Sequence, residues 1–305
     1  MQHILVMGTG AVGGYYGAQL ASAEHLDVTF IARGAQYDAL KKNGLRITGL
    51  TEMHIDPVQV MSDPSGLTRP PDLVLVAVKS FDTPGAIELL RPVAGNHTRI
   101  LTIQNGLENY ELLADAFGSQ NVIRGFCKIG VEVIEPGVIE YRGLSSIIFG
   151  EEDGKPTNRV LQIQKIMEHA GINAEVSGDI RKEAWLKFMW NGIFNMLTGL
   201  ADVTTDAIFR EDAAYATAWQ LFYEMQAIAR AQGVPVSDKD GAGVIDRTKS
   251  LGAFKTSTWQ DRRKNKPLEY DTFCGYIVRK SERYELDVPV NRALLSLYRM
   301  MEQAG

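Results

Sequence analysis

HILVMGTGAVGG, residues 3–14, is an apolar run that passes directly into a cluster of glycines. Within it, Gly8-Thr9-Gly10-Ala11-Val12-Gly13 follows the G-x-G-x-x-G pattern of a dinucleotide-binding turn between a strand and a helix. In that pattern Gly8 permits a tight turn, Gly10 lets the backbone approach a pyrophosphate, and Gly13 lets the helix pack closely on the strand. The N-terminus of the helix supplies N–H groups for the anion. A glycine-rich turn without a ligand can have the same letters, but the strand before it favours nucleotide binding.

The sequence around this turn alternates between strands and helices over residues 1–150. Short apolar runs occur at residues 4–7, 28–32, 73–78 and 100–103, and a helix is expected at 13–23. Continuous apolar runs of this kind are typical of strands that are covered on both faces, as in a parallel sheet. A strand, a helix and a second strand form a βαβ unit at the start of the chain. We therefore predict an α/β, Rossmann-type doubly wound domain.

A different pattern begins at Phe126. The runs Lys128–Ile134 and Val138–Tyr141 flank Glu135-Pro136-Gly137, a turn signal that predicts an antiparallel hairpin. Further strands are expected at residues 145–149 and 173–176, with a helix at 158–170. The first domain is therefore expected to span residues 1–178.

After Asp179 the pattern is helical, with breaks at Gly233-Val234-Pro235 and at Val288-Pro289. Helices are expected at residues 180–200, 206–232, 238–250, 268–284 and 291–303. We predict a second, all-helical C-terminal domain over residues 179–305, which would bind the substrate. Whether this domain also forms the interface of a homodimer stays open.

The composition is that of an ordinary globular protein. Of 305 residues, 45% are hydrophobic and 23% charged, and the formal net charge of −5 gives no reason to expect nucleic acid. The longest apolar run, Leu73–Val78, is too short to span a membrane, and the N-terminus has no signal segment. Cys127 and Cys274 are far apart, and the five histidines lack metal-ligand spacing. We expect a cytoplasmic protein with reduced thiols and no metal.

The end of the second expected strand bears on the choice between NAD and NADP. An NAD site needs an acid there to accept a hydrogen bond from the ribose 2′-hydroxyl. Here the strand ends in Arg33, and no acid follows until Asp38. Because a guanidinium suits a 2′-phosphate and accepts no hydrogen bond, the sequence favours NADP(H).

Two further strand ends carry candidate binding residues. Lys79 ends the third expected strand and Gln104-Asn105-Gly106 ends the fourth, at the edge where ligands lie in an open α/β sheet. A solvated lysine and an Asn-Gly turn would give the same letters, so those alternatives stay open. Tyr15 and Tyr16, which follow the glycine turn, could likewise border a nicotinamide or pack in the core.

Residues 185–197, WLKFMWNGIFNML, are apolar nearly all round and as a helix should be buried. Lys187, Asn191 and Asn195 recur at every fourth position and predict a polar stripe along this helix. A buried ammonium is costly unless it is paired or lines a wet cleft, and burial lowers a lysine pKa towards the range of a general acid. No histidine follows His169, so a reduced carbonyl would receive its proton from Lys187. The alternative is that the stripe is the narrow solvent face of the helix.

Further polar candidates lie between residues 256 and 270. Ser257 precedes a basic run at residues 262–266, and such a run is more often a solvated loop than a ligand site. Glu269 follows Pro267 in the first turn of an expected helix, where the helix dipole alone favours an acid. These patterns alone leave the roles of Ser257 and Glu269 open.

Taken together, these motifs resemble the ketopantoate reductase family over essentially the whole chain. They occur in that family's order: the glycine turn, Arg33, Lys79, Gln104-Asn105-Gly106, Trp185-x-Lys187-x3-Asn191-x3-Asn195, Ser257-x2-Gln260-Asp261, and Glu269 followed by Gly275. Each motif is short, but together they are specific. Two positions depart from the family's usual pattern, because Glu108 stands where a small residue is common and Cys274 where an asparagine is usual.

The resemblance implies an enzyme that reduces a 2-oxo acid with NADPH, with ketopantoate (2-dehydropantoate) yielding (R)-pantoate on the way to pantothenate and coenzyme A. Arg33 and Lys79 would hold the NADPH phosphates, and Asn105 would lie by the nicotinamide ribose and the substrate. The alternatives are a reductase of the same build that acts on another bulky 2-oxo acid, and a non-catalytic NADPH-binding sensor.

The resemblance also implies which residues meet the substrate. Lys187 would be the general acid, and Glu269 would orient either Lys187 or the substrate. Asn191, Asn195 and Ser257 would hydrogen-bond the substrate's carboxylate and hydroxyl groups.

Overall fold

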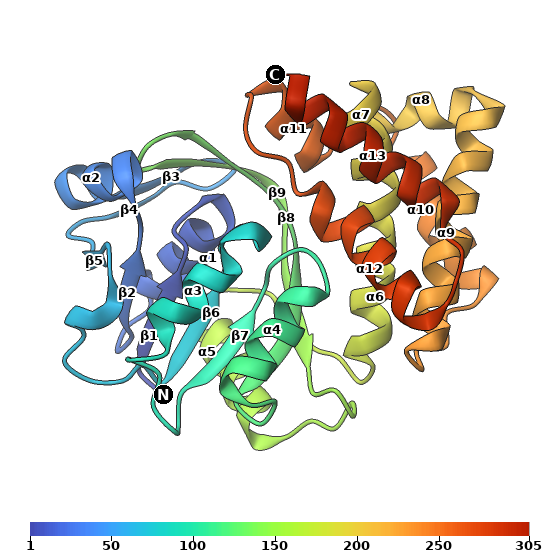
Figure 1. Ribbon diagram of the computed structural model, residues 1–305. Coiled ribbons are helices and arrows are strands. Elements are labelled where there is room, and N and C mark those ends of the chain that lie inside the picture. The colour runs from blue at the N-terminus through green and yellow to red at the C-terminus, as the bar shows by residue number, and fades with distance from the viewer. Residues whose placement is uncertain (305) are drawn as a thin grey trace. The chain divides into compact units, whose positions relative to one another are not determined.

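The first apolar run of the chain forms β1, His3–Met7, inside a ten-stranded sheet. The computed structural model describes residues 1–304. The parallel strands around β1 are β2 (Asp27–Ile31), β5 (Val60–Met61), β6 (Leu73–Val76), β7 (Arg99–Thr102) and β8 (Val122–Glu135). Their order, β5-β2-β1-β6-β7-β8, is that of a doubly wound sheet, with its switch point between β1 and β6 (Figure 1). The Rossmann-type N-terminal domain is thereby confirmed.

Both faces of this sheet are covered. Val6 and Leu75 belong to one core cluster, which includes side chains of α1 and α5. Leu5 and Val74 belong to a second cluster, which includes side chains of α3 and α4. Because successive residues of a strand face opposite sides, a strand covered on both faces is a continuous apolar run. The helices of this unit are α1 (Ala11–Ser22), α2 (Gly34–Asn43), α3 (Thr83–Leu90), α4 (Glu108–Phe117) and α5 (Asn158–His169), with short turns η1 (Pro64–Gly66) and η2 (Ser80–Asp82).

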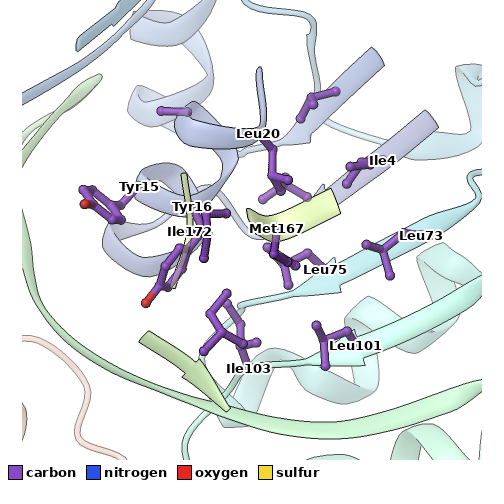
Figure 2. Close-up of a cluster of buried hydrophobic side chains, with 14 of the residues drawn as sticks. Ile4, Tyr15, Tyr16, Leu20, Leu73, Leu75, Leu101, Ile103, Met167 and Ile172 are labelled. Atoms are coloured by element: carbon purple, nitrogen blue, oxygen red, sulfur yellow. The ribbon is translucent and has the colours of Figure 1, made fainter. Parts of the chain in front are cut away.

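Tyr15 and Tyr16 are core residues of the first cluster, as Figure 2 shows. The Tyr16 side chain is fully buried, and its hydroxyl donates to the carbonyl oxygen of Ser146 at 3.2 Å. The Tyr15 ring stacks on that of Tyr141, with the ring centroids 4.7 Å apart. Burial raises the pKa of both phenols. The structure therefore gives both tyrosines a packing role.

A long antiparallel hairpin follows the parallel strands, with the predicted turn between β8 and β9 (Val138–Gly150). The sequence predicted two short strands at residues 138–141 and 145–149, but both belong to β9. They form one strand because β8 spans 14 residues and pairs with β9 through irregular register at Gly130 and Gly143. Three further strands complete the sheet: β3 (Leu45–Gly49) and β10 (Ala174–Val176) beside β9, and β4 (Met53–Ile55) beside β3.

The described chain after β10 is helical, which confirms the predicted C-terminal domain (Figure 1). The predicted helix at 206–232 is divided at Glu211, whose carboxylate caps the second part by accepting from the Ala214 N–H at 2.5 Å. Two other predicted helices, at 180–200 and 268–284, contain the π-helical turns η3 and η4. The elements are α6 (Ile180–Trp190), η3 (Asn191–Asn195), α7 (Met196–Ala201), α8 (Thr205–Arg210), α9 (Asp212–Ala231), α10 (Asp238–Ser250), α11 (Ser257–Arg263), η4 (Asp271–Gly275), α12 (Tyr276–Tyr284) and α13 (Pro289–Ala304).

The chain divides into two units. The first comprises Met1–Asn105 and Asn109–Ile180, and the second comprises Gly106–Glu108 and Arg181–Gly305. Across residues 1–304, none of the helices combines the length and the apolar character that crossing a membrane requires. The same residues contain no group of three or more His, Cys, Asp or Glu side chains that could hold a metal ion.

Candidate active site

The glycine turn after β1 has the conformation that its sequence predicts. Gly8 has a φ of +102°, and a Cβ there would lie 2.8 Å from the backbone nitrogen of Val78. A Cβ on Gly13 would lie 2.1 Å from the carbonyl oxygen of Gly8, so glycine lets α1 begin this close to β1. Gly10 differs, because no described atom lies within 4 Å of the place its Cβ would take. The packing of the described chain does not require a glycine at this position, and the open space fits the close approach of a ligand to the backbone.

The start of α1 fits an anion. The helix begins at Ala11, and its N-cap residue, Gly10, has no side chain that could cap it. The buried Thr9 hydroxyl donates to the Ile31 carbonyl oxygen at 2.9 Å, and the Gln36 amide donates to the Thr9 carbonyl oxygen at 3.0 Å. These two bonds fix the turn, and N–H groups in the first turn of a helix attract phosphate groups. The residues of the turn therefore fit the pyrophosphate of a dinucleotide.

Arg33 lies directly after β2, at the N-cap position of α2, with a side chain that is 68% exposed. Its guanidinium donates to the Asp82 carboxylate at 3.0 Å. Asp82 ends η2 and stands at the N-cap position of α3, where its carboxylate makes no capping hydrogen bond within the described chain. The sequence patterns did not single out Asp82, because a pair of residues 49 positions apart leaves no local signal.

Lys79 and Asn105 follow β6 and β7, which are parallel neighbours, so both lie at the carboxyl edge of the sheet. Hydrogen bonds join the loops that carry them. The Gln104 amide donates to the Thr83 hydroxyl at 2.8 Å, and the Asn109 amide donates to the Asn105 carbonyl oxygen at 2.7 Å. Gln104 is 6% exposed, so this network is a buried structural support that the sequence did not indicate.

Lys187 lies in α6 of the second unit and is half-buried. Its ammonium is 4.7 Å from the centroid of the Trp190 ring, within the range in which an aromatic face attracts a cation. The Trp190 indole N–H donates to the Thr248 hydroxyl at 2.7 Å, which anchors the ring. The ring of Phe254 meets Trp190 edge-on, with the centroids 6.0 Å apart. A partly desolvated ammonium therefore lies against an aromatic wall.

Asn191 and Asn195 are the first and last residues of the π-helical turn η3. They are 2% and 1% exposed, so the polar stripe is not a solvent face of the helix. The α-helix predicted at 180–200 is interrupted at this point by a π turn, which is wider than an α-helical turn; such turns are frequent at functional sites. The Asn195 amide donates to the exposed Ser257 hydroxyl at 3.2 Å. The side-chain amide oxygen of Asn195, Oδ1, is buried and has no hydrogen-bond partner within residues 1–304.

Glu269 is 8% exposed and lies directly before the helical segment that contains η4. Both η4 and α11, which begins at Ser257, pack against η3. The second unit therefore brings together the segments that carry Lys187, Asn191, Asn195, Ser257 and Glu269.

Part of the basic run at residues 262–266 proved to be structural. Arg262 lies in α11 and donates to the Gly199 carbonyl oxygen at 2.6 Å, near the end of α7. The expectation that the whole run is a solvated loop is therefore wrong, because the guanidinium satisfies carbonyl groups at a helix end.

Two family models match this chain. One, described as "Ketopantoate reductase PanE/ApbA", covers residues 4–154, and the other, described as its C-terminal part, covers residues 179–302. The chain belongs to the ketopantoate reductase family. A 2-dehydropantoate 2-reductase of Mesorhizobium japonicum is 32% identical over 98% of this chain and 97% of its own length. A 2-dehydropantoate 2-reductase of Archaeoglobus fulgidus is 30% identical over 99% of this chain and 98% of its own length.

Solved structures agree with this membership. The crystal structure of a 2-dehydropantoate 2-reductase from Geobacter metallireducens superposes with a TM-score of 0.90 at 31% identity, covering 99% of this chain and 100% of the other. A D-mandelate dehydrogenase solved with NADH and anilino(oxo)acetate has a TM-score of 0.90 at 20% identity and covers 99% of each chain. The latter likeness shows a shared fold.

Two positions at which this ketopantoate reductase family member departs from the usual pattern have structural partners. The Glu108 carboxylate lies 2.7 Å from Arg279, which is also 2.7 Å from Asp271. Cys274 lies in η4 with no exposed surface, and burial raises the pKa of its thiol well above the ordinary value. Glu108 therefore takes part in an exposed ion pair, whereas Cys274 is part of the core of the second unit.

Proposed function

We propose that this protein reduces ketopantoate to (R)-pantoate with NADPH, in the cytoplasm, on the route to pantothenate and coenzyme A. One observation carries the proposal. The Lys187 ammonium lies against the Trp190 ring, and the helical segment that carries it continues into a turn with two buried asparagines, Asn191 and Asn195. Relatives that align over nearly their whole length at about 30% identity are named for this reaction, which supports the choice of substrate.

The cofactor supplies the hydride, and residues of the chain supply the proton and orient the reacting groups. Bound NADPH would supply a hydride to the C2 carbonyl carbon. Lys187 donates a proton to the carbonyl oxygen as negative charge develops there, and the low polarity around Trp190 strengthens that interaction. Glu269 orients Lys187 or the substrate.

Asn191, Asn195 and Ser257 position the substrate. A buried oxygen atom that accepts no hydrogen bond costs free energy, and the side-chain amide oxygen of Asn195, Oδ1, is such an atom. The hydroxyl of ketopantoate is a donor that would satisfy it. Ser257, which is hydrogen-bonded to Asn195, and Asn191 would both donate hydrogen bonds to the substrate's carboxylate.

Arg33, Lys79 and the glycine turn bind the cofactor. The open position at Gly10 admits the pyrophosphate, and Arg33 attracts the 2′-phosphate, so NADPH is the proposed form. Asn105 lies at the same edge of the sheet and meets the nicotinamide ribose.

A second candidate is the reduction of another bulky 2-oxo acid. The aromatic rings beside Lys187 favour it: Trp190 contacts both Phe194 and Phe254, with centroids 5.8 and 6.0 Å away. An aromatic wall of this kind would suit an aryl side chain as well as a branched one.

Measuring the loss of NADPH absorbance with ketopantoate, beside a panel of aliphatic and aryl 2-oxo acids, tests the proposal. We expect ketopantoate to give the highest kcat/KM. A higher value for another acid would favour the second candidate, and binding of NADPH without turnover of any acid would indicate a sensor.

A further inference from the structure

The Asp82 carboxylate lies next to Arg33, the arginine proposed to bind the 2′-phosphate of NADPH, where a second negative charge is unexpected. The strand end that normally bears the acid of an NAD site bears Arg33 instead, and the acid comes from the loop after β6. The Asp82 carboxylate is 3.0 Å from the guanidinium, and its side chain is 33% exposed.

The topology explains how the two residues meet. β2 and β6 lie on either side of β1, and all three strands run parallel, so their carboxyl ends share one edge. Arg33 follows β2, Asp82 follows β6, and the glycine turn follows β1 between them. The ion pair therefore spans the part of the edge that carries the turn.

Helix capping does not account for Asp82. An aspartate at an N-cap ordinarily accepts a hydrogen bond from an N–H in the first helical turn. The Asp82 carboxylate makes no such bond within the described residues and instead accepts from Arg33. The carboxylate is therefore directed towards the residue that would meet the cofactor's ribose.

We propose that Asp82 is a specificity-determining residue that narrows the preference for NADPH over NADH. This inference rests on the proposed cofactor role of Arg33. A 2′-phosphate on Arg33 lies close to the Asp82 carboxylate and is repelled by it. A 2′-hydroxyl can instead donate a hydrogen bond to the same carboxylate, as it does to the acid of an NAD site. The pair thus accommodates both dinucleotides, one through each partner.

The test compares the dissociation constants of NADPH and NADH for the wild type and for Asp82→Asn, by titration calorimetry without substrate and at fixed ionic strength. Asparagine keeps the size of the side chain and removes the charge. We expect the ratio of the NADH to the NADPH constant to rise by about three- to tenfold, chiefly through tighter NADPH binding.

Glu88→Gln is the matched control. Glu88 lies in α3 and pairs with Arg91 at 3.1 Å on an exposed surface, so this variant loses the same charge from the same region. Its ratio should stay within about twofold of the wild type. An equal rise in both variants would show a general charge effect and overturn the role of Asp82.

The outcomes separate this inference from the proposed function. An unchanged ratio in Asp82→Asn, or weaker NADPH binding because Asp82 merely orients Arg33, overturns the inference while the wild type still binds NADPH. A wild type that binds neither dinucleotide overturns the inference and the proposed function together.

Discussion

Lys187 is the side chain on which the proposed chemistry depends most. An ammonium beside the Trp190 ring is stabilised by the aromatic face and remains a donor for a developing oxyanion. Loss of a general acid typically lowers turnover by roughly 10²–10⁴-fold. We expect that loss in kcat for Lys187→Ala, measured at saturating NADPH and 2-oxo acid.

Lys182→Ala controls for this prediction. Lys182 lies in the same helix, 3.0 Å from the Asp240 carboxylate. Its removal takes a cation from α6 without touching the aromatic wall, and turnover should stay near the wild-type value. Wild-type turnover in Lys187→Ala would show that Lys187 is not the general acid.

At the scale of elements, the glycine turn contains two kinds of glycine. Gly13 is fixed by the chain itself, because a Cβ there would collide with the Gly8 carbonyl oxygen. Gly10 has open space around it. We expect Gly10→Ala to keep the unfolding temperature of the wild type but to bind NADPH at least about tenfold more weakly, because the methyl group takes the place of the pyrophosphate.

Gly13→Ala is the contrasting variant and should lower the unfolding temperature as well as NADPH affinity. Thermal unfolding and calorimetric titration of both variants check the pair. Wild-type affinity in Gly10→Ala would mean that the open space at Gly10 does not receive the cofactor.

Elements defined by local pattern were predicted well from the sequence, and those defined by distant partners were not. β1, β2, β6 and β7 are short segments rich in apolar and β-branched residues, so the sequence itself indicates that they are buried strands. β3 was not predicted because it is only five residues long and one of its two partners, β9, lies nearly a hundred residues away. The π turns were missed because an extra residue in a helical turn does not change the apolar character of the segment.

The same distinction holds for the candidate site. Arg33, Lys187 and the asparagines are conspicuous as polar residues at strand ends or within an apolar helix. Asp82 was not singled out, and the buried hydrogen bonds of Gln104 were not predicted, because both depend on partners on other loops.

The stability of the fold depends on pH through an ion pair between a buried glutamate, Glu151, and a half-buried arginine, Arg159. Glu151, after β9, accepts from the Arg159 guanidinium of α5 at 2.7 Å. Burial alone would raise the pKa of the Glu151 carboxyl, but hydrogen bonds from Arg159 and Thr157 outweigh burial and hold the pKa below the ordinary value of 4.5. The stabilisation is therefore complete above the pKa of the unfolded chain and is lost as the pH falls through the lower, folded value.

We expect Glu151→Gln to lower the free energy of unfolding at neutral pH by about 1–2 kcal/mol and to reduce the loss of stability in acid. Denaturant titrations from neutral to acidic pH measure both effects. Asp153→Asn removes an exposed partner of Lys155 nearby and should leave the free energy of unfolding close to the wild-type value, because solvent screens the pair. Equal acid sensitivity in the wild type and Glu151→Gln would exclude this pair as the cause.

In the proposed reaction a hydride passes from NADPH to the C2 carbon of a 2-oxo acid, and isotope transfer tests this step most directly. The protein is incubated with ketopantoate and NADPH that carries deuterium at the transferable position of C4, and the product is analysed by mass spectrometry. We expect pantoate with one deuterium at C2, formed far more slowly by Lys187→Ala. Absence of pantoate, or pantoate without deuterium, would contradict the account.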